Sequence, residues 1–135
     1  MAGLHRSVEL IRRPSTACIV DFHVEATASQ DLTVSVHLRN DDSTILHLIR
    51  ARLYNDNQIS VDGTEWKAVN EPIWESLQKS CENTNKSRDV VTFRDYIPGV
   101  KLWTAETPNL YTLVLEQLDP ETMKTVQAES CRVGF

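Results

Sequence analysis

The sequence predicts an all-β fold, a sandwich of about seven antiparallel strands with one long, partly helical insertion. Two observations lead to this class. Apolar and polar residues alternate along several runs of the chain, and a period of two is typical of half-buried strands. Short stretches rich in Asn, Asp, Ser and Pro separate most of these runs, as turns require. The pattern is that of two packed sheets.

The first two strands are expected at residues 16–26 and 32–39, joined by a turn at 28–31. In the first, every second residue from Cys18 to Ala26 shares one face, and the opposite face carries Ile19, Asp21, His23 and Glu25. In the second, the inner face is expected to consist of Leu32, Val34, Val36 and Leu38.

Five further strands are expected at 46–54, 58–61, 90–97, 110–118 and 124–133. The run 110–118 is long and apolar, so it is expected to be a central strand. Alternation then predicts that one core forms between the two sheets from Phe22, Val34, Val36, Ile49, Leu53, Phe93, Leu113 and Leu115.

Residues 62–89 form a long segment without strand periodicity, which we interpret as an insertion. Pro72 suits the first turn of a helix. A narrow apolar stripe at helical spacing follows it, formed by Ile73, Trp74, Leu77 and Cys81. Residues 83–86 are polar and expected to be mobile. Two roles stay open for the insertion: contact with a partner, or packing on its own sheet.

Composition excludes several classes of protein. A length of 135 residues suits one domain, and 24% charged residues with 41% hydrophobic residues is an ordinary globular composition. The net charge of -5 argues against binding to nucleic acid. No apolar run approaches the ~20 residues that span a bilayer, and residues 1–14 lack the apolar core of a signal peptide.

Three cysteines, Cys18, Cys81 and Cys131, fit neither a disulfide framework nor a zinc site. Free thiols in a reducing compartment are the favoured interpretation. A bridge between Cys18 and Cys131 stays open, because the terminal strands of a sandwich can lie close together.

No catalytic, cofactor-binding or metal residue is expected. The four histidines, which lack metal-ligand spacing, are His5, His23, His37 and His47. Asn70-Glu71-Pro72 resembles the acid/base tripeptide of barrel glycosidases, but that chemistry needs a second carboxylate about 5 Å away. We interpret the match as coincidence, with Glu71 a solvated acid in a first helical turn.

Three tryptophans remain, Trp66, Trp74 and Trp103. Aromatic rings can stack on sugars, but they more often anchor a core or a neighbouring domain. We expect burial.

Four segments carry a family resemblance. Residues 100–113 (VKLWTAETPNLYTL) are similar to a P-K-L-W-S-A-E-x-P-x-L-Y-x-L signature of family 2 glycoside hydrolases of the β-galactosidase type, with Val100 in place of Pro. Residues 3–10 (GLHRSVEL) resemble the exit from the family's jelly-roll domain. Residues 19–24 (IVDFHV) resemble its sandwich entry, and 129–135 (ESCRVGF) its exit into the barrel.

The resemblance implies an immunoglobulin-like sandwich domain between a jelly-roll sugar-binding domain and a catalytic barrel. Residues 1–14 would be the exit segment of the preceding domain, and 15–135 the sandwich. The parent would be a retaining β-galactosidase, whose acid/base and nucleophile lie in the barrel and which can use Mg or Na. None of these groups is implied for this domain.

The implied partners are other domains of the same enzyme chain and a neighbouring subunit. No nucleic acid and no membrane is expected as a partner, and the expected location is the cytoplasm. Two alternatives are a stand-alone carbohydrate-binding or adhesion module, which needs exposed aromatics, and a glycosidase that uses Glu71. Within the signature, Tyr111 can reach back to an upstream backbone group, as in a tyrosine corner.

Overall fold

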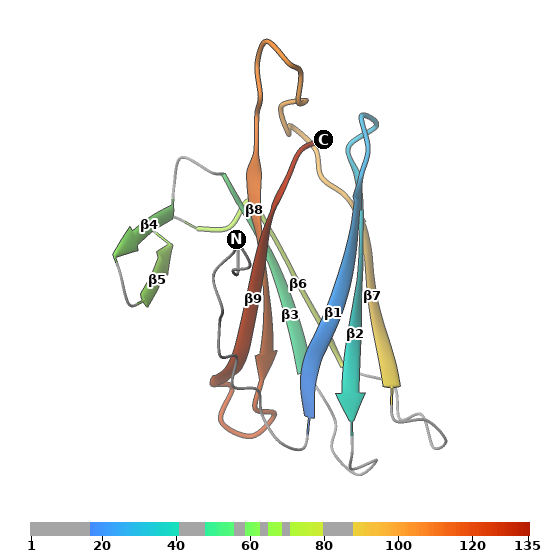
Figure 1. Ribbon diagram of the computed structural model, residues 1–135, viewed down its shortest axis with the longest axis vertical. Coiled ribbons are helices and arrows are strands. Elements are labelled where there is room, and N and C mark those ends of the chain that lie inside the picture. Colours follow the sequence, from blue (N-terminus) through green and yellow to red (C-terminus); the bar gives the residue numbers. More distant parts are fainter. Residues whose placement is uncertain (1–16, 41–47, 56–58, 63–64, 69–70, 80–87) are drawn as a thin grey trace, which may run out of the picture.

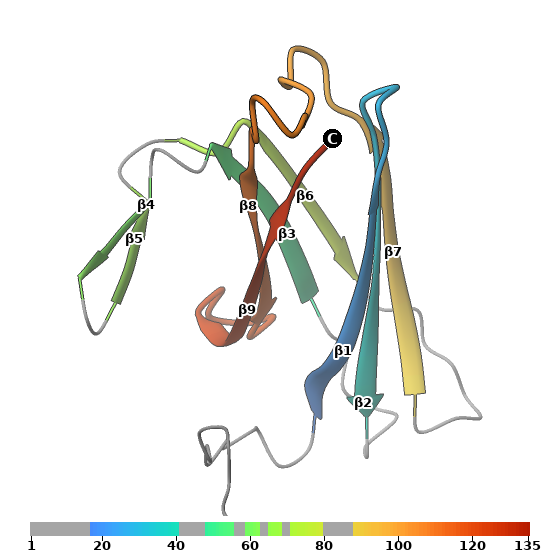
Figure 2. The same cartoon turned by 45° about the horizontal axis from the view of Figure 1, so that its top comes forward.

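Two antiparallel sheets face each other in the computed structural model, which describes residues 17–40, 48–55, 59–62, 65–68, 71–79 and 88–135 (Figure 1; Figure 2). The first sheet has the order β1–β2–β7, with strands Ala17–Ala26, Asp31–Asn40 and Arg88–Tyr96. The second has the order β6–β3–β8–β9, with strands Trp74–Lys79, Leu48–Asn55, Tyr111–Leu118 and Thr125–Val133. The predicted sandwich of seven antiparallel strands is confirmed with one exchange: β6 is its seventh strand, whereas the strand expected at 58–61 falls in a separate hairpin.

A separate hairpin consists of β4 (Ile59–Asp62) and β5 (Glu65–Ala68), which pair with each other. It projects away from the two sheets (Figure 1). Residues 1–14, expected to be an exit segment, lie outside the described residues. So do residues 83–86, for which mobility is expected. Within the described ranges, no helix is long and apolar enough to cross a bilayer.

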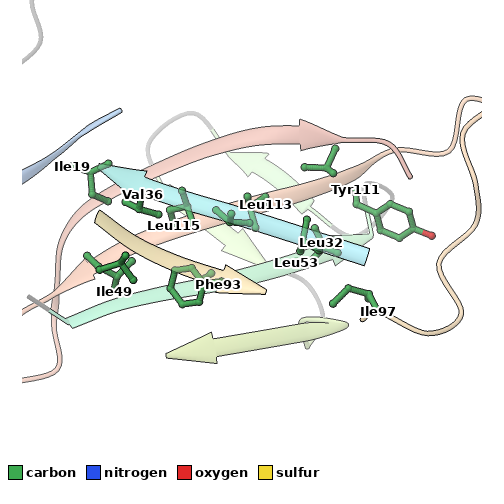
Figure 3. Packing of buried hydrophobic residues seen from close by; sticks show 14 of the residues in the cluster. Ile19, Leu32, Val36, Ile49, Leu53, Phe93, Ile97, Tyr111, Leu113 and Leu115 are labelled. Carbon is green, nitrogen blue, oxygen red and sulfur yellow. The ribbon is translucent and has the colours of Figure 1, made fainter. Parts of the chain in front are cut away.

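One core fills the space between the sheets, as alternation requires (Figure 3). β8 lies between β3 and β9, so the expectation of a central strand is confirmed. Leu113 and Leu115 on β8 are fully buried. Of the eight expected core residues, seven are buried and Phe22 is partly buried against them.

The expected faces of β1 are wrong at its start. Ile19, placed on the outer face by strict alternation, is buried in the core opposite Leu38. A register shift lies between Ile19 and Asp21. Such a bulge adds one residue to one strand and reverses the alternation beyond it. The Gln127 side chain of β9 bridges the sheets here: Ile19 N donates to Gln127 Oε1 (2.9 Å), and Gln127 Nε2 donates to the Ile19 carbonyl oxygen (3.0 Å).

The helix expected after Pro72 is also wrong. The segment forms β6, which pairs along β3 from Leu53 opposite Trp74 to Leu48 opposite Lys79. Trp74 packs against the core, whereas Leu77 is 47% exposed. A six-residue helix is too short to be stable by itself, whereas a strand of this length forms inter-strand hydrogen bonds with the edge of β3. Cys81, the end of the expected stripe, lies outside the described residues.

Candidate functional site

The connection between β7 and β8 is fixed by Tyr111, the first residue of β8. Lys101 N donates a hydrogen bond to Tyr111 Oη over 2.7 Å. The Tyr111 ring packs edge-on against Phe135, with centroids 5.6 Å apart, and both side chains are buried. The expectation that Tyr111 reaches an upstream backbone group is confirmed. The buried Tyr111 thus ties an irregular connection to the start of β8 through its hydroxyl, and to Phe135 through its ring.

Replacing Tyr111 with phenylalanine keeps the ring but removes this acceptor. We expect the free energy of unfolding to fall by about 1–2 kcal/mol, because the Lys101 amide loses its partner in a partly buried position. Urea unfolding would measure the difference. Tyr96→Phe is the matched control, because its hydroxyl donates a solvent-exposed hydrogen bond to the Gln30 side chain. An equal effect of the two substitutions would contradict the assigned role.

Hydrogen bonds within the connection brace it further. The Thr104 and Thr107 backbones pair, with Thr104 N donating to the Thr107 carbonyl oxygen (3.1 Å). Thr107 N donates to Thr104 Oγ1 (2.9 Å), and Asn109 Nδ2 donates to the Leu102 carbonyl oxygen (2.9 Å). The segment therefore has a defined shape despite the absence of regular structure.

Trp103 lies where this connection meets the C-terminal residues. Its backbone N donates to the Phe135 carbonyl oxygen over 2.7 Å. A Cβ atom added at Gly134 would lie 3.1 Å from Trp103 Cβ, so the close approach favours glycine there. The indole is nevertheless 50% exposed, and the expectation that Trp103 is buried is wrong. Trp103 is held by its backbone hydrogen bond to Phe135 and by the close approach of its Cβ to Gly134.

The other tryptophans differ. Trp74 is partly buried, packs edge-on against Phe93 with centroids 6.4 Å apart, and donates its indole N–H to Asp95 Oδ2 over 2.8 Å. It thereby links the edge strands β6 and β7 of the two sheets. The side chain of Trp66 lies outside the described part of the chain.

A cluster of charged side chains lies on the outer face of the four-stranded sheet. Glu116 on β8 accepts hydrogen bonds from Arg50 Nε (2.9 Å), from Arg52 Nη2 and from Thr125 Oγ1 (2.9 Å). The Arg52 guanidinium also lies 5.9 Å from the centre of the Tyr54 ring. Glu116 is nearly buried, and the arginines retain about a quarter of their side-chain exposure.

These partners determine the charge states in the cluster. Burial alone would raise the pKa of Glu116, but the hydrogen bonds from Arg50, Thr125 and Arg52 outweigh it, so the pKa lies below its ordinary value of 4.5. The hydrogen bond to Glu116 raises the pKa of Arg50. Burial raises the pKa of Tyr54. The cluster is an ion pair network in which both oxygens of the carboxylate accept hydrogen bonds from donors of this domain.

Sequence reasoning missed Glu116. Alternation along residues 49–53 puts Arg50 and Arg52 on the outer face of their strand but identifies no partner for them. The available signal was a single acid inside the apolar run 110–118, because a charge in a central strand needs a counter-charge on a neighbouring strand. Its partners follow only from the register, which sets Glu116 opposite Arg50.

The residues weighed for chemistry lie apart. Glu71 is exposed at the approach to β6 and not on a helix, while Asn70 lies outside the described residues. His23 is exposed beside Glu25 (3.2 Å), and His37 is half-buried. His5 and His47 fall in ranges the structure leaves undescribed. Among the described side chains, no group of three His, Cys, Asp or Glu residues could hold a metal ion.

The two described cysteines are free thiols. Cys18 is buried on β1, and Cys131 is half-buried on β9, where burial raises the pKa of the thiol. A raised pKa lowers the reactivity of a thiol near neutral pH. For Cys18, burial in β1 limits its access to solvent.

Comparisons with known proteins agree with this architecture. Residues 14–135 match the family described as glycosyl hydrolases family 2. The chain is 31% identical over 142 residues to a curated β-galactosidase of Priestia megaterium (strain DSM 319 / IMG 1521), a match that covers 100% of this chain and 12% of the relative.

Solved structures show the same fold. A family 2 glycosyl hydrolase from Bacteroides cellulosilyticus DSM 14838 superposes with a TM-score of 0.59 at 17% identity, over 84% of this chain and 14% of the other. A β-D-mannosidase from Dictyoglomus thermophilum gives 0.60 at 20% identity, over 88% and 13%. The family match spans the whole described sandwich, and the chain belongs to glycosyl hydrolases family 2.

Proposed function

We propose that this chain is the non-catalytic sandwich domain of a longer, retaining β-galactosidase, where it spaces and supports the domains on either side. The observation that carries the proposal is the match to the Priestia megaterium β-galactosidase, which runs along 100% of this chain and only 12% of that protein. The acid/base and nucleophile would then belong to a barrel domain outside residues 1–135, and cofactors such as Mg or Na to the parent enzyme.

The described side chains support a structural role. Glu116, the acid most strongly held by partners, accepts hydrogen bonds from three residues of its own domain, which leaves it poorly placed to protonate a leaving group. Tyr111, Gln127 and Trp74 each tie separate segments together. We also propose a cytoplasmic location, since the free thiols of Cys18 and Cys131 suit a reducing compartment.

An assay with a nitrophenyl β-galactoside tests whether the 135-residue chain has glycosidase activity of its own. We expect no release of nitrophenol above the uncatalysed rate, because one exposed carboxylate at Glu71 does not supply a retaining pair. Turnover by the chain that disappears in Glu71→Gln and persists in the matched control Glu75→Gln would contradict the proposal.

A second function, carbohydrate binding, is favoured by one observation. Trp103 is half exposed, and Tyr96, on the same end of the sandwich, is 56% exposed. Titrating the chain with galactose and lactose while following tryptophan fluorescence separates the two functions. A saturable change that Trp103→Ala abolishes would favour a binding module, and the absence of any change would favour a supporting domain.

The proposed contact role of residues 62–89 has partial support. In the described part of this segment, Ile73 and Leu77 leave 46% and 47% of their area exposed, although β6 itself packs on β3. The segment thus packs on its own sheet through one face and leaves apolar area on the other. We propose that this second face contacts a neighbouring domain or subunit in the longer enzyme.

A further inference from the structure

The end of the sandwich that carries the C-terminus combines a braced backbone with exposed apolar side chains. The connection between β7 and β8, the β1–β2 turn and the C-terminus all lie at this end (Figure 1). On the connection, Leu102 is 42% exposed and Trp103 is 50% exposed. Exposed apolar side chains that form a contiguous patch mark interaction sites, whereas single exposed ones are ordinary.

Rigidity separates this surface from an ordinary loop tip. Each exposed residue is held by its backbone: the Leu102 carbonyl oxygen accepts from Asn109 Nδ2, and Trp103 N donates to the Phe135 carbonyl oxygen. Lys101, directly before them, is bonded to the buried Tyr111 hydroxyl. Two large side chains are thereby presented in a fixed geometry, which lowers the entropic cost of a contact.

The indole of Trp103 also has an unused polar group. Within the described residues its N–H makes no hydrogen bond, in contrast to the indole of Trp74, which bonds Asp95. Tryptophan at a contact typically buries its ring and donates its N–H to the partner. A surface that matches this side chain would be an apolar pocket with a carbonyl or carboxylate oxygen at its edge.

We infer that Leu102 and Trp103 form the docking surface for the domain that follows Phe135 in the longer enzyme. This rests on the proposed function. The occupant is chosen by continuity: the hydrogen bond between Trp103 N and the Phe135 carbonyl oxygen places the start of any following segment beside this surface. Covalent attachment at that point gives the following domain a high effective concentration there.

Oxidation of Trp103 by hydroxyl radicals, read by mass spectrometry, tests the inference on the 135-residue chain and on the longer enzyme. We expect Trp103 to oxidise at least about fivefold more slowly in the longer enzyme, because docking removes its exposed area. Met123 is the internal control: it is 48% exposed in the β8–β9 turn, at the opposite end of the sandwich, and should oxidise equally in both.

Two variants locate the surface. In the longer enzyme, Leu102→Glu should return Trp103 to the oxidation rate of the chain alone, because a carboxylate in an apolar contact is strongly unfavourable. Val126→Glu, a matched change at an exposed residue near the start of β9, should leave Trp103 protected. Equal oxidation of Trp103 in the two polypeptides, or protection that survives Leu102→Glu, would overturn the inference.

The outcomes also separate this inference from the function on which it rests. Protection of Trp103 in a longer protein that does not hydrolyse galactosides would reject the proposed activity and keep the docking surface. Exposure of Trp103 in an active galactosidase would reject only the docking surface. Protection in the chain alone that increases with concentration would identify a second copy as the occupant and overturn the inference.

Discussion

Replacing Leu113 with alanine should lower the free energy of unfolding of the chain by about 2–5 kcal/mol, the range for large-to-small changes in a packed core. Leu113 is fully buried on β8, an inner strand with neighbours on both sides, and it faces the opposite sheet (Figure 3). The surrounding side chains are held by two sheets and cannot close the cavity easily. Urea unfolding, monitored by circular dichroism, measures the loss.

Leu77→Ala is the matched control, because the same atoms are removed from an edge strand where the side chain is 47% exposed. We expect a change of about 1 kcal/mol or less there. A loss at Leu113 no larger than that at Leu77 would show that β8 does not form the centre of the core.

Replacing Glu116 with glutamine should cost about 1–3 kcal/mol at neutral pH, because Arg50 and Arg52 lose the carboxylate that accepts from both. The cost should depend on pH. Since the folded state lowers the pKa of Glu116 below 4.5, the stabilisation is complete above that value and is lost as the pH falls through the lowered pKa. The wild-type chain and the variant should therefore converge in acid.

Urea unfolding at pH 7 and at several values from pH 4.5 downward measures this convergence. Glu25→Gln is the control, since that carboxylate is exposed beside His23 and exposed pairs contribute little. A difference between wild type and Glu116→Gln that stays constant from neutral to acid pH would contradict the assigned role of the charge.

The period-two pattern was sufficient to predict most of the sandwich, and its failures have physical causes. β2 alternates cleanly, and its faces follow from sequence alone. The pattern fails at β6, because Trp74 and Leu77 are three residues apart, a spacing that fits a helix, while the decisive contact is the edge of β3. The bulge before Asp21 could not be predicted, because nothing local in the sequence indicates an extra residue.

Among the features of the candidate site, those with partners nearby in sequence could be predicted, and those with distant partners could not. The role of Tyr111 could be predicted because its partner, Lys101, is ten residues upstream in the same motif. Glu116 pairs with arginines 64 and 66 residues away, and such pairs depend on strand register, which a local pattern does not determine. The position of Trp103 likewise depends on a backbone hydrogen bond to Phe135, 32 residues further along the chain.

The most direct test of the account is the rate of β-galactoside hydrolysis by the longer enzyme with and without residues 1–135, measured before and after mild heating. A supporting domain predicts that deletion abolishes the activity or makes it far more sensitive to heat, because the remaining domains lose an interface that stabilises them. A shortened enzyme that is as active and as heat-resistant as the complete one would contradict the supporting role.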